Sequence, residues 1–132
     1  MTTDVHAALR QFGEEAGLSG LTFGARGQAV LQAASGRQFG VELAGREVLA
    51  HVSQPLDYDA SDWLLRAFRR AHYARLDGDW PVQAALREQG GRQRLLALTR
   101  IAEGEFTARR LRQAFDDLSR WLDAVRDDSP LE

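Results

Sequence analysis

The feature that most constrains the fold is a change in the hydrophobic repeat along the chain. Residues 4–16 place apolar side chains at steps of three and four, the period of an amphipathic helix. In the middle of the chain Phe39, Val41 and Leu43 alternate with polar or small residues, as in a half-buried antiparallel strand. From residue 108 the three-four repeat returns. The chain therefore predicts a helix at each end and a sheet between them.

Five short apolar runs are separated by residues that favour turns. They cover residues 28–34, 38–43, 47–53, 82–88 and 92–101. Gln89-Gly90-Gly91, between the last two runs, is a strong hairpin signal. Residues 61–76 and 108–126 have helical patterns, with Thr107 as the cap of the last helix. We therefore predict an α+β fold in the order α-β-β-β-α-β-β-α, with an antiparallel sheet and three helices.

Composition indicates one globular domain, which we place at residues 1–130; the final Leu131-Glu132 we interpret as a remnant of cloning. Apolar residues make up 44% and charged residues 27% of the 132 residues, an ordinary globular balance. No apolar run could span a membrane, and the start of the chain lacks a signal peptide's layout. Cysteine is absent, which excludes disulfides and thiolate chemistry. Together these features favour the cytoplasm.

Candidate catalytic and metal-binding residues are few. Residues 57–61, Asp-Tyr-Asp-Ala-Ser, have the spacing of the DxDx[ST] loop of aspartyl-phosphate phosphatases, but that chemistry needs a lysine and a longer chain. All 17 basic residues are arginine, so we interpret Asp59 or Ser61 as a helix cap. His6, His51 and His72 do not have a metal-ligand spacing. We expect no catalytic residue, no metal and no cofactor.

The helix predicted at residues 61–76 is apolar over too much of its circumference. At about 100° per residue, its apolar side chains cover about 220°, whereas a helix on one core needs a stripe of little more than about 100°. We predict that the surplus forms a homodimer interface; the alternative is that the helix lies between elements of its own domain. The predicted interface residues are Trp63, Leu64, Ala67, Phe68 and Ala71.

The arginines of this helix, Arg66, Arg69, Arg70 and Arg75, form a small basic patch. Nucleic-acid binding would use such residues for phosphate contacts. No aromatic residues are interleaved with them in the pattern of such sites, and the formal net charge of the chain is −2. We interpret the patch as a solvated helix face, and we expect neither nucleic acid nor membrane as a partner.

The layout resembles the class I type III secretion chaperones of bacteria, the Tir-chaperone type. The resemblance covers about residues 4–126. It rests on VHAALRQFGEEAGL followed by LTFGARGQAVLQ, the paired strands RQFGVELAGREVLAHV, the helix SDWLLRAFRRAHYARL, and LLALTRIAEGEF followed by RRLRQAFDDLSRWLDAV. It implies a homodimer, formed largely through the second helix and the neighbouring strand, that holds the N-terminal segment of a secreted effector in extended form without ATP.

The strands between residues 21 and 52 offer more alternating apolar positions than one small core face can absorb. We therefore expect some of them to line a surface that binds the partner. The candidates are Phe23, Val30, Phe39, Val41 and Val48. Two alternatives stay open: a general protein-interaction domain of the YbjN-like kind, and a small-ligand binder or enzyme, which would require a deep pocket with converging polar groups.

Overall fold

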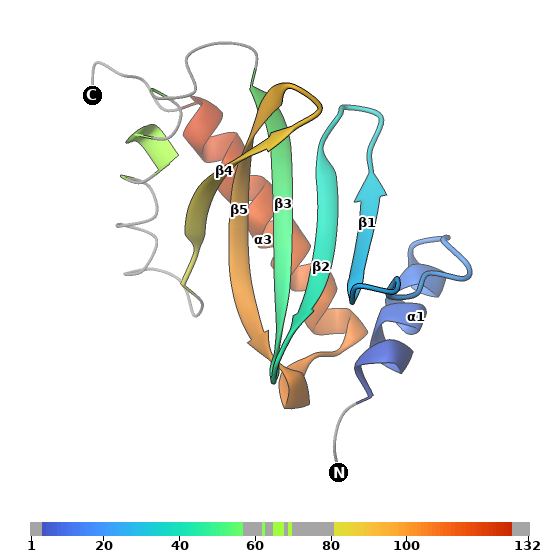
Figure 1. The fold of residues 1–132 in the computed structure, drawn as a ribbon. Coiled ribbons are helices and arrows are strands. Elements are labelled where there is room, and N and C mark those ends of the chain that lie inside the picture. The colour runs from blue at the N-terminus through green and yellow to red at the C-terminus, as the bar shows by residue number, and fades with distance from the viewer. Residues whose placement is uncertain (1–3, 57–61, 63–64, 68, 70–80, 128–132) are drawn as a thin grey trace.

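A five-stranded antiparallel sheet forms the centre of the computed structural model, which describes residues 4–56, 62, 65–67, 69 and 81–127 (Figure 1). The strand order is β1-β2-β3-β5-β4. The strands are β1 (Gln28–Gln32), β2 (Gln38–Ala44), β3 (Glu47–Leu56), β4 (Gln83–Gln89) and β5 (Arg92–Ala102). The helices are α1 (Val5–Glu15) and α3 (Ala108–Asp127), with a short 3₁₀ turn at Glu103–Glu105.

The α+β fold predicted from the sequence is confirmed, including the hairpin at residues 89–91. Of the helix predicted at 61–76, the described residues 62, 65–67 and 69 have helical backbone, and the remainder lies outside the described residues. No helix in the described part of the chain has the length and apolar character needed to cross a membrane.

Capping residues fix where the two long helices begin. The Asp4 carboxylate accepts hydrogen bonds from the backbone N–H groups of His6 and Ala7, at 2.9 and 3.3 Å. The Thr107 hydroxyl accepts from the backbone N–H of Arg110 at 3.1 Å. Each side chain satisfies donors that the first helical turn leaves unpaired. The cap predicted at Thr107 is confirmed.

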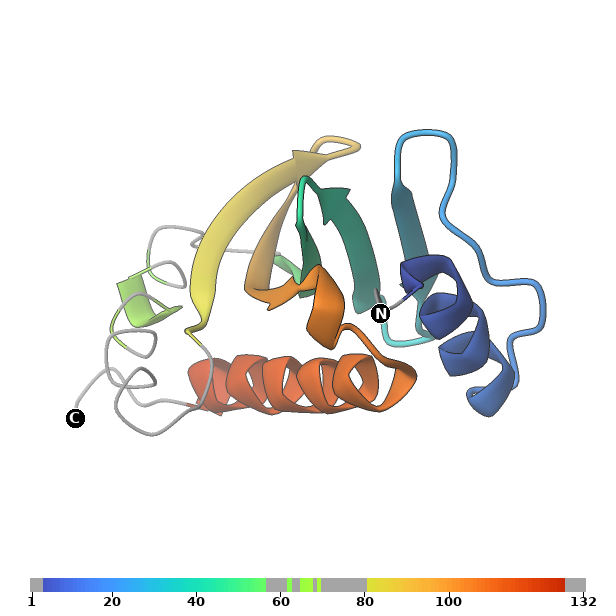
Figure 2. The ribbon, with the colours of Figure 1, turned by 90° about the horizontal axis from the view of Figure 1, so that it is seen from below.

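The core lies between one face of the sheet and α3, which crosses that face in both views (Figures 1 and 2). The four-three repeat of α3 supplies the helical side of this core: Leu111, Phe115, Leu118, Leu122 and Val125 are all buried. The Phe115 ring makes edge-to-face contacts with Phe12 of α1 and Phe39 of β2, at centroid distances of 5.5 and 5.4 Å. This cluster joins α1, α3 and the sheet.

The opposite side of the sheet, which we call the open face, has no described helix over it (Figure 2). The strand register places Gly40 beside His51 on this face. A Cβ atom built on Gly40 would lie 2.2 Å from Cε1 of His51, so the imidazole ring occupies the space that a side chain at residue 40 would fill. The His51 side chain is buried although it lies on the open face.

We expect the Gly40→Ala substitution to destabilise the protein by about 1–3 kcal/mol, because the added methyl group must displace the His51 ring. Urea unfolding measures the loss. Gly104→Ala is the matched control, since nothing lies within 4 Å of a Cβ built there. In a His51→Ala background the cost of Gly40→Ala should largely disappear; an undiminished cost would contradict the proposed overlap.

Candidate protein-binding surface

The outer edge of β1 presents backbone groups with no strand beside them in the described part of the chain. Hydrogen-bonded pairs alternate along an antiparallel ladder. The N–H of Leu43 donates to the carbonyl of Gly27, and the N–H of Ala33 donates to the carbonyl of Arg37, each at 2.8 Å, so the odd-numbered residues bond to β2. The N–H and C=O of Val30 therefore point outward, where an extended chain could pair with them.

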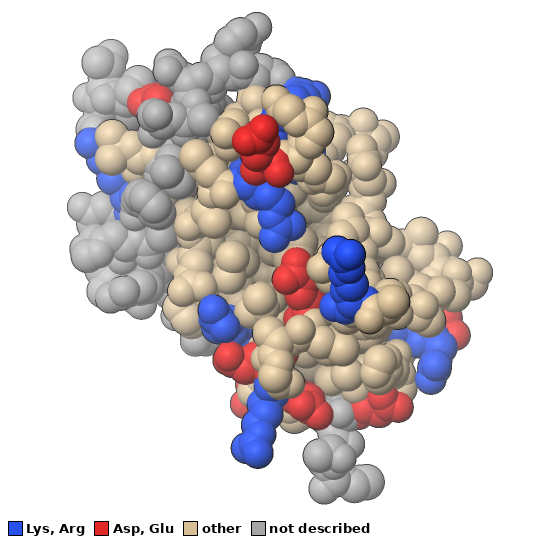
Figure 3. Space-filling model, viewed as in Figure 1, with Lys and Arg blue, Asp and Glu red and all other residues tan. Residues whose placement is uncertain are grey.

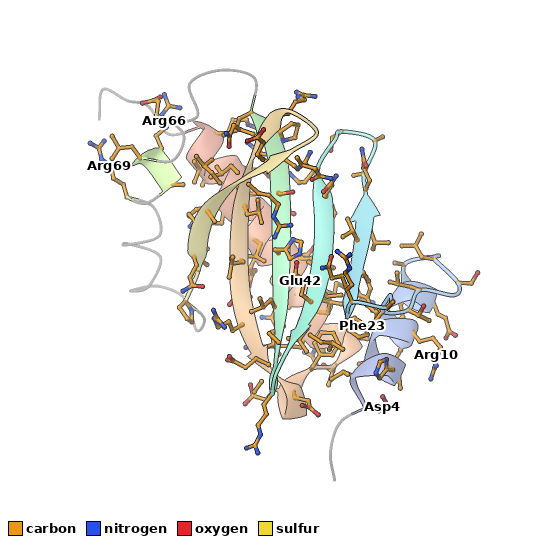
Figure 4. The ribbon with its side chains drawn as sticks, in the orientation of Figure 1. Asp4, Arg10, Phe23, Glu42, Arg66 and Arg69 are labelled. Carbon is orange, nitrogen blue, oxygen red and sulfur yellow. The ribbon has the colours of Figure 1, made fainter. Side chains whose placement is uncertain are left out.

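Apolar side chains flank this edge. Val30 is 52% exposed and Leu43 is 36% exposed, both large for apolar residues in strands. Phe23 is half-buried between α1 and β1, where its ring makes an edge-to-face contact with His6 at 5.4 Å (Figure 4). We call the outer edge of β1 together with Phe23, Val30 and Leu43 the β1 edge surface. It combines backbone pairing with apolar contacts, the two requirements for binding an extended peptide.

The partner-binding residues predicted from the sequence are divided between this surface and the core. Val30 is exposed and Phe23 is half-buried, and both belong to the β1 edge surface. Val41 and Val48 are 2% and 1% exposed, so they are core residues and are not accessible to a partner. Phe39 is half-buried against Phe115. Alternation identified the strand faces but could not show that α3 covers one of them.

Most of the predicted dimer interface lies outside the described residues: Trp63, Leu64, Phe68 and Ala71. The remaining member, Ala67, is fully buried within the single chain and packs in its core. Leu65 of the same segment is 50% exposed. The homodimer therefore stays a prediction. Leu65 is an exposed apolar residue of the same segment that the interface predicted from the sequence did not include.

The open face carries a charged cluster that the sequence did not reveal. Glu42, labelled near its centre in Figure 4, has one carboxylate oxygen 3.7 Å from Nε2 of His51 and 3.7 Å from a guanidinium nitrogen of Arg87. Arg87 comes from β4 and Glu42 from β2, so the arginine side chain spans β5 and β3. No spacing in the sequence indicates this cluster, because β2 and β4 are not neighbours in the sheet and the contact depends on the path of a long side chain.

Burial controls the protonation of His51. Removal of the imidazole from water lowers its pKa below the ordinary 6.5, an effect that nearby Glu42 partly opposes and Arg87 reinforces. Neither ring nitrogen has a hydrogen-bond partner within the described structure. Among residues 4–56, 62, 65–67, 69 and 81–127, no three histidine, aspartate or glutamate side chains are grouped closely enough to hold a metal ion.

The fold is similar to those of known secretion chaperones. SchA in the HopA1–SchA chaperone–effector complex superposes with a TM-score of 0.70 at 14% identity, covering 92% of each chain. The Yersinia pestis type III secretion chaperone SycH, solved with a stable fragment of YscM2, gives 0.65 at 12% identity over 92% of this chain and 99% of SycH. YbjN from E. coli gives 0.60 at 18% identity over 89% of each chain. No protein-family profile and no curated protein matches the sequence.

We expect the free energy of unfolding to fall as the pH is lowered below 6.5. The unfolded chain binds the His51 proton more tightly than the folded protein, so acidification favours unfolding, and the stabilisation is complete only above that pH. Urea unfolding across this range checks the effect. A His51→Leu variant should lose part of the pH dependence, whereas the exposed-site variant His6→Gln should keep it. If the free energy of unfolding of the wild type and of His51→Leu fell equally steeply with pH, the assignment of the effect to His51 would be wrong.

Proposed function

We propose that the chain is a cytoplasmic type III secretion chaperone that binds the N-terminal segment of a secreted effector in extended form. The observation that carries the proposal is the β1 edge surface, which offers outward backbone groups and exposed apolar side chains within this fold. SchA and SycH, which share the fold, were solved with an effector and with a fragment of YscM2. The role needs no catalytic residue, metal or ATP.

Binding an extended segment has a thermodynamic requirement that favours a homodimer. A disordered segment loses conformational entropy when it binds, so useful affinity needs a large wrapped surface, on the order of 1,000–3,000 Å². The β1 edge surface of one subunit, with a strand of 5 residues, is a small part of that area. A second subunit would double the edge and the apolar contacts available to one client.

The second candidate is a general protein-interaction domain of the YbjN-like kind; YbjN, described as a candidate transcription regulator, shares the fold. Such a protein could use the same edge strand for a partner that is never secreted. The two roles are separated by the identity of the bound chain and by where in that chain the bound segment lies. Recovery of the tagged protein from its own cells under secreting conditions, with mass spectrometry of the co-purifying chains, makes this distinction.

We expect Val30→Pro to weaken binding of the co-purified client segment by about tenfold or more, because proline removes the outward N–H that would donate to the client. The substitution leaves the ladder to β2 intact, since the inward hydrogen bonds belong to the odd-numbered neighbours. Calorimetry with the client segment measures the affinity and should also show a clearly negative heat-capacity change.

Val30→Thr is the matched control for this experiment, because it keeps the branched side-chain shape and the N–H. It should weaken binding much less than Val30→Pro if pairing at the edge matters. Equal binding by the wild type and a folded Val30→Pro variant would show that the client does not pair with β1. Absence of any co-purifying polypeptide would contradict the chaperone proposal itself.

We expect Leu65→Glu to shift the protein from dimer to monomer, because the half-exposed leucine adjoins the residues proposed to form the subunit contact. Light scattering and sedimentation measure the change. Arg69→Gln is the control, since Arg69 is an exposed polar residue four positions along the same helical segment. Ala67→Glu is less informative, because Ala67 is buried within its own chain. A monomeric wild type would contradict the proposal.

A further inference from the structure

Arg94 on β5 is a buried arginine with no acidic partner in the described structure. Its side chain donates to the hydroxyl of Ser53 at 3.0 Å, to the carbonyl of Gly36 at 2.7 Å and to the carbonyl of Ser53 at 3.3 Å. All three acceptors are neutral, although the residue is only 9% exposed. Burial lowers the pKa of Arg94, and the positive charge of Arg92 lowers it further. The structure therefore holds a cation in a place where its charge is not compensated.

Arg37 is another poorly exposed arginine of this chain, and unlike Arg94 it has an acidic partner. Its side chain is 16% exposed and forms an ion pair with Asp123 at 2.9 Å, in addition to hydrogen bonds with neutral acceptors. Arg94 has the neutral acceptors without the carboxylate. A carboxylate from outside the chain would give Arg94 the environment that Arg37 already has.

A second arginine faces the same position. The register of β4 and β5 places Arg87 directly opposite Arg94 on the open face, and like charges in such a pair are destabilising. Arg87 extends away from Arg94 to Glu42, and that contact is long at 3.7 Å with the Arg87 side chain 51% exposed. Within the described residues, Glu42 is the one acid within ion-pair distance of Arg87. The same Glu42 oxygen lies equally close to His51. Arg87 could therefore turn to a new carboxylate at small cost.

The surroundings of the two arginines suit a polypeptide. Leu98 is half-buried on the open face, and the register continues from Leu98 through His51 and Gly40 to the exposed Val30. The open face therefore combines partly exposed apolar side chains with the positive charge of Arg87 and Arg94 at one end.

We propose that the open face of the sheet is a second docking surface, which binds an acidic, extended segment of a protein partner through carboxylate contacts with Arg87 and Arg94. This inference rests on the proposed function and refines it: the segment that pairs with β1 continues across the open face, or a separate segment of the same partner binds there. A nucleic acid fits less well, because charges of both signs are scattered over this face (Figure 3) and Glu42 lies at its centre.

The test is selection of short random peptides, displayed on phage, against the purified full chain. We expect aspartate and glutamate to be enriched in the selected pool, and an Asp→Asn change in a selected peptide to weaken binding about tenfold. Arg87→Gln should abolish both effects without affecting folding, because the side chain is exposed. Arg100→Gln is the matched control: Arg100 lies on the same face of β5, is 50% exposed and pairs with Glu47 at 3.5 Å.

The outcomes separate this inference from the proposed function. Selected peptides whose binding depends on the Val30 edge but not on acidic residues or Arg87 would overturn the inference and leave the proposed function standing. Failure to select any peptide would count against both. Binding of a single-stranded oligonucleotide that is stronger than peptide binding and is lost in Arg87→Gln would overturn the inference in favour of a nucleic-acid partner. An Arg94→Lys variant, which keeps the charge, should retain acidic enrichment if it folds.

Discussion

The structure depends on the contact between the apolar stripe of α3 and one face of the sheet. Phe115 lies at the centre of this contact, where its ring meets Phe12 and Phe39 from elements far apart in the sequence. Burial of aromatic rings contributes both a large apolar area and preferred edge-to-face geometry. Because the apolar stripe of α3 packs on this face, the described structure has no helix on the opposite face. The asymmetry between the two faces is the source of the open face, whereas the exposed edge follows from β1 being the outermost strand of the sheet.

The hydrophobic repeat was sufficient to predict the helices and strands, because a helix and a strand have different repeats. The alternation at residues 38–43 and the four-three repeat of α3 each match only one type of backbone, and the turn residues between the strands fixed the connections. The order of the strands within the sheet was not predicted and comes from the structure, where β5 lies between β3 and β4. The helix cap at Thr107 was predictable because its side chain acts within one turn of the chain.

The binding surfaces could be predicted only in part, since they depend on which face is covered. Val30 and Val41 look alike in the sequence, yet the side chain of Val30 is 52% exposed and that of Val41 only 2%. The register pairs Val30 with Gly40, the neighbour of Val41 on β2, and successive strand positions point to opposite faces, so the two valines lie on opposite faces of the sheet. The charged cluster of Glu42, His51 and Arg87 could not be predicted from the sequence at all. Arg87 and Glu42 lie on strands that are not adjacent, so their contact follows from the path of a long side chain across the sheet and not from any spacing.

The unpaired edge of β1 also creates a risk that the chain must limit. An exposed edge strand is a template on which further copies of the same protein can add, leading to aggregation. Here the strand is only 5 residues long, begins and ends with glutamine, and has the carbonyl of Gln28 already occupied by the N–H of Gly24 at 2.7 Å. The segment left for pairing is about two residues around Val30, too short for stable self-association by backbone pairing alone. A partner at this edge therefore needs side-chain contacts on either side of that segment in addition to backbone pairing.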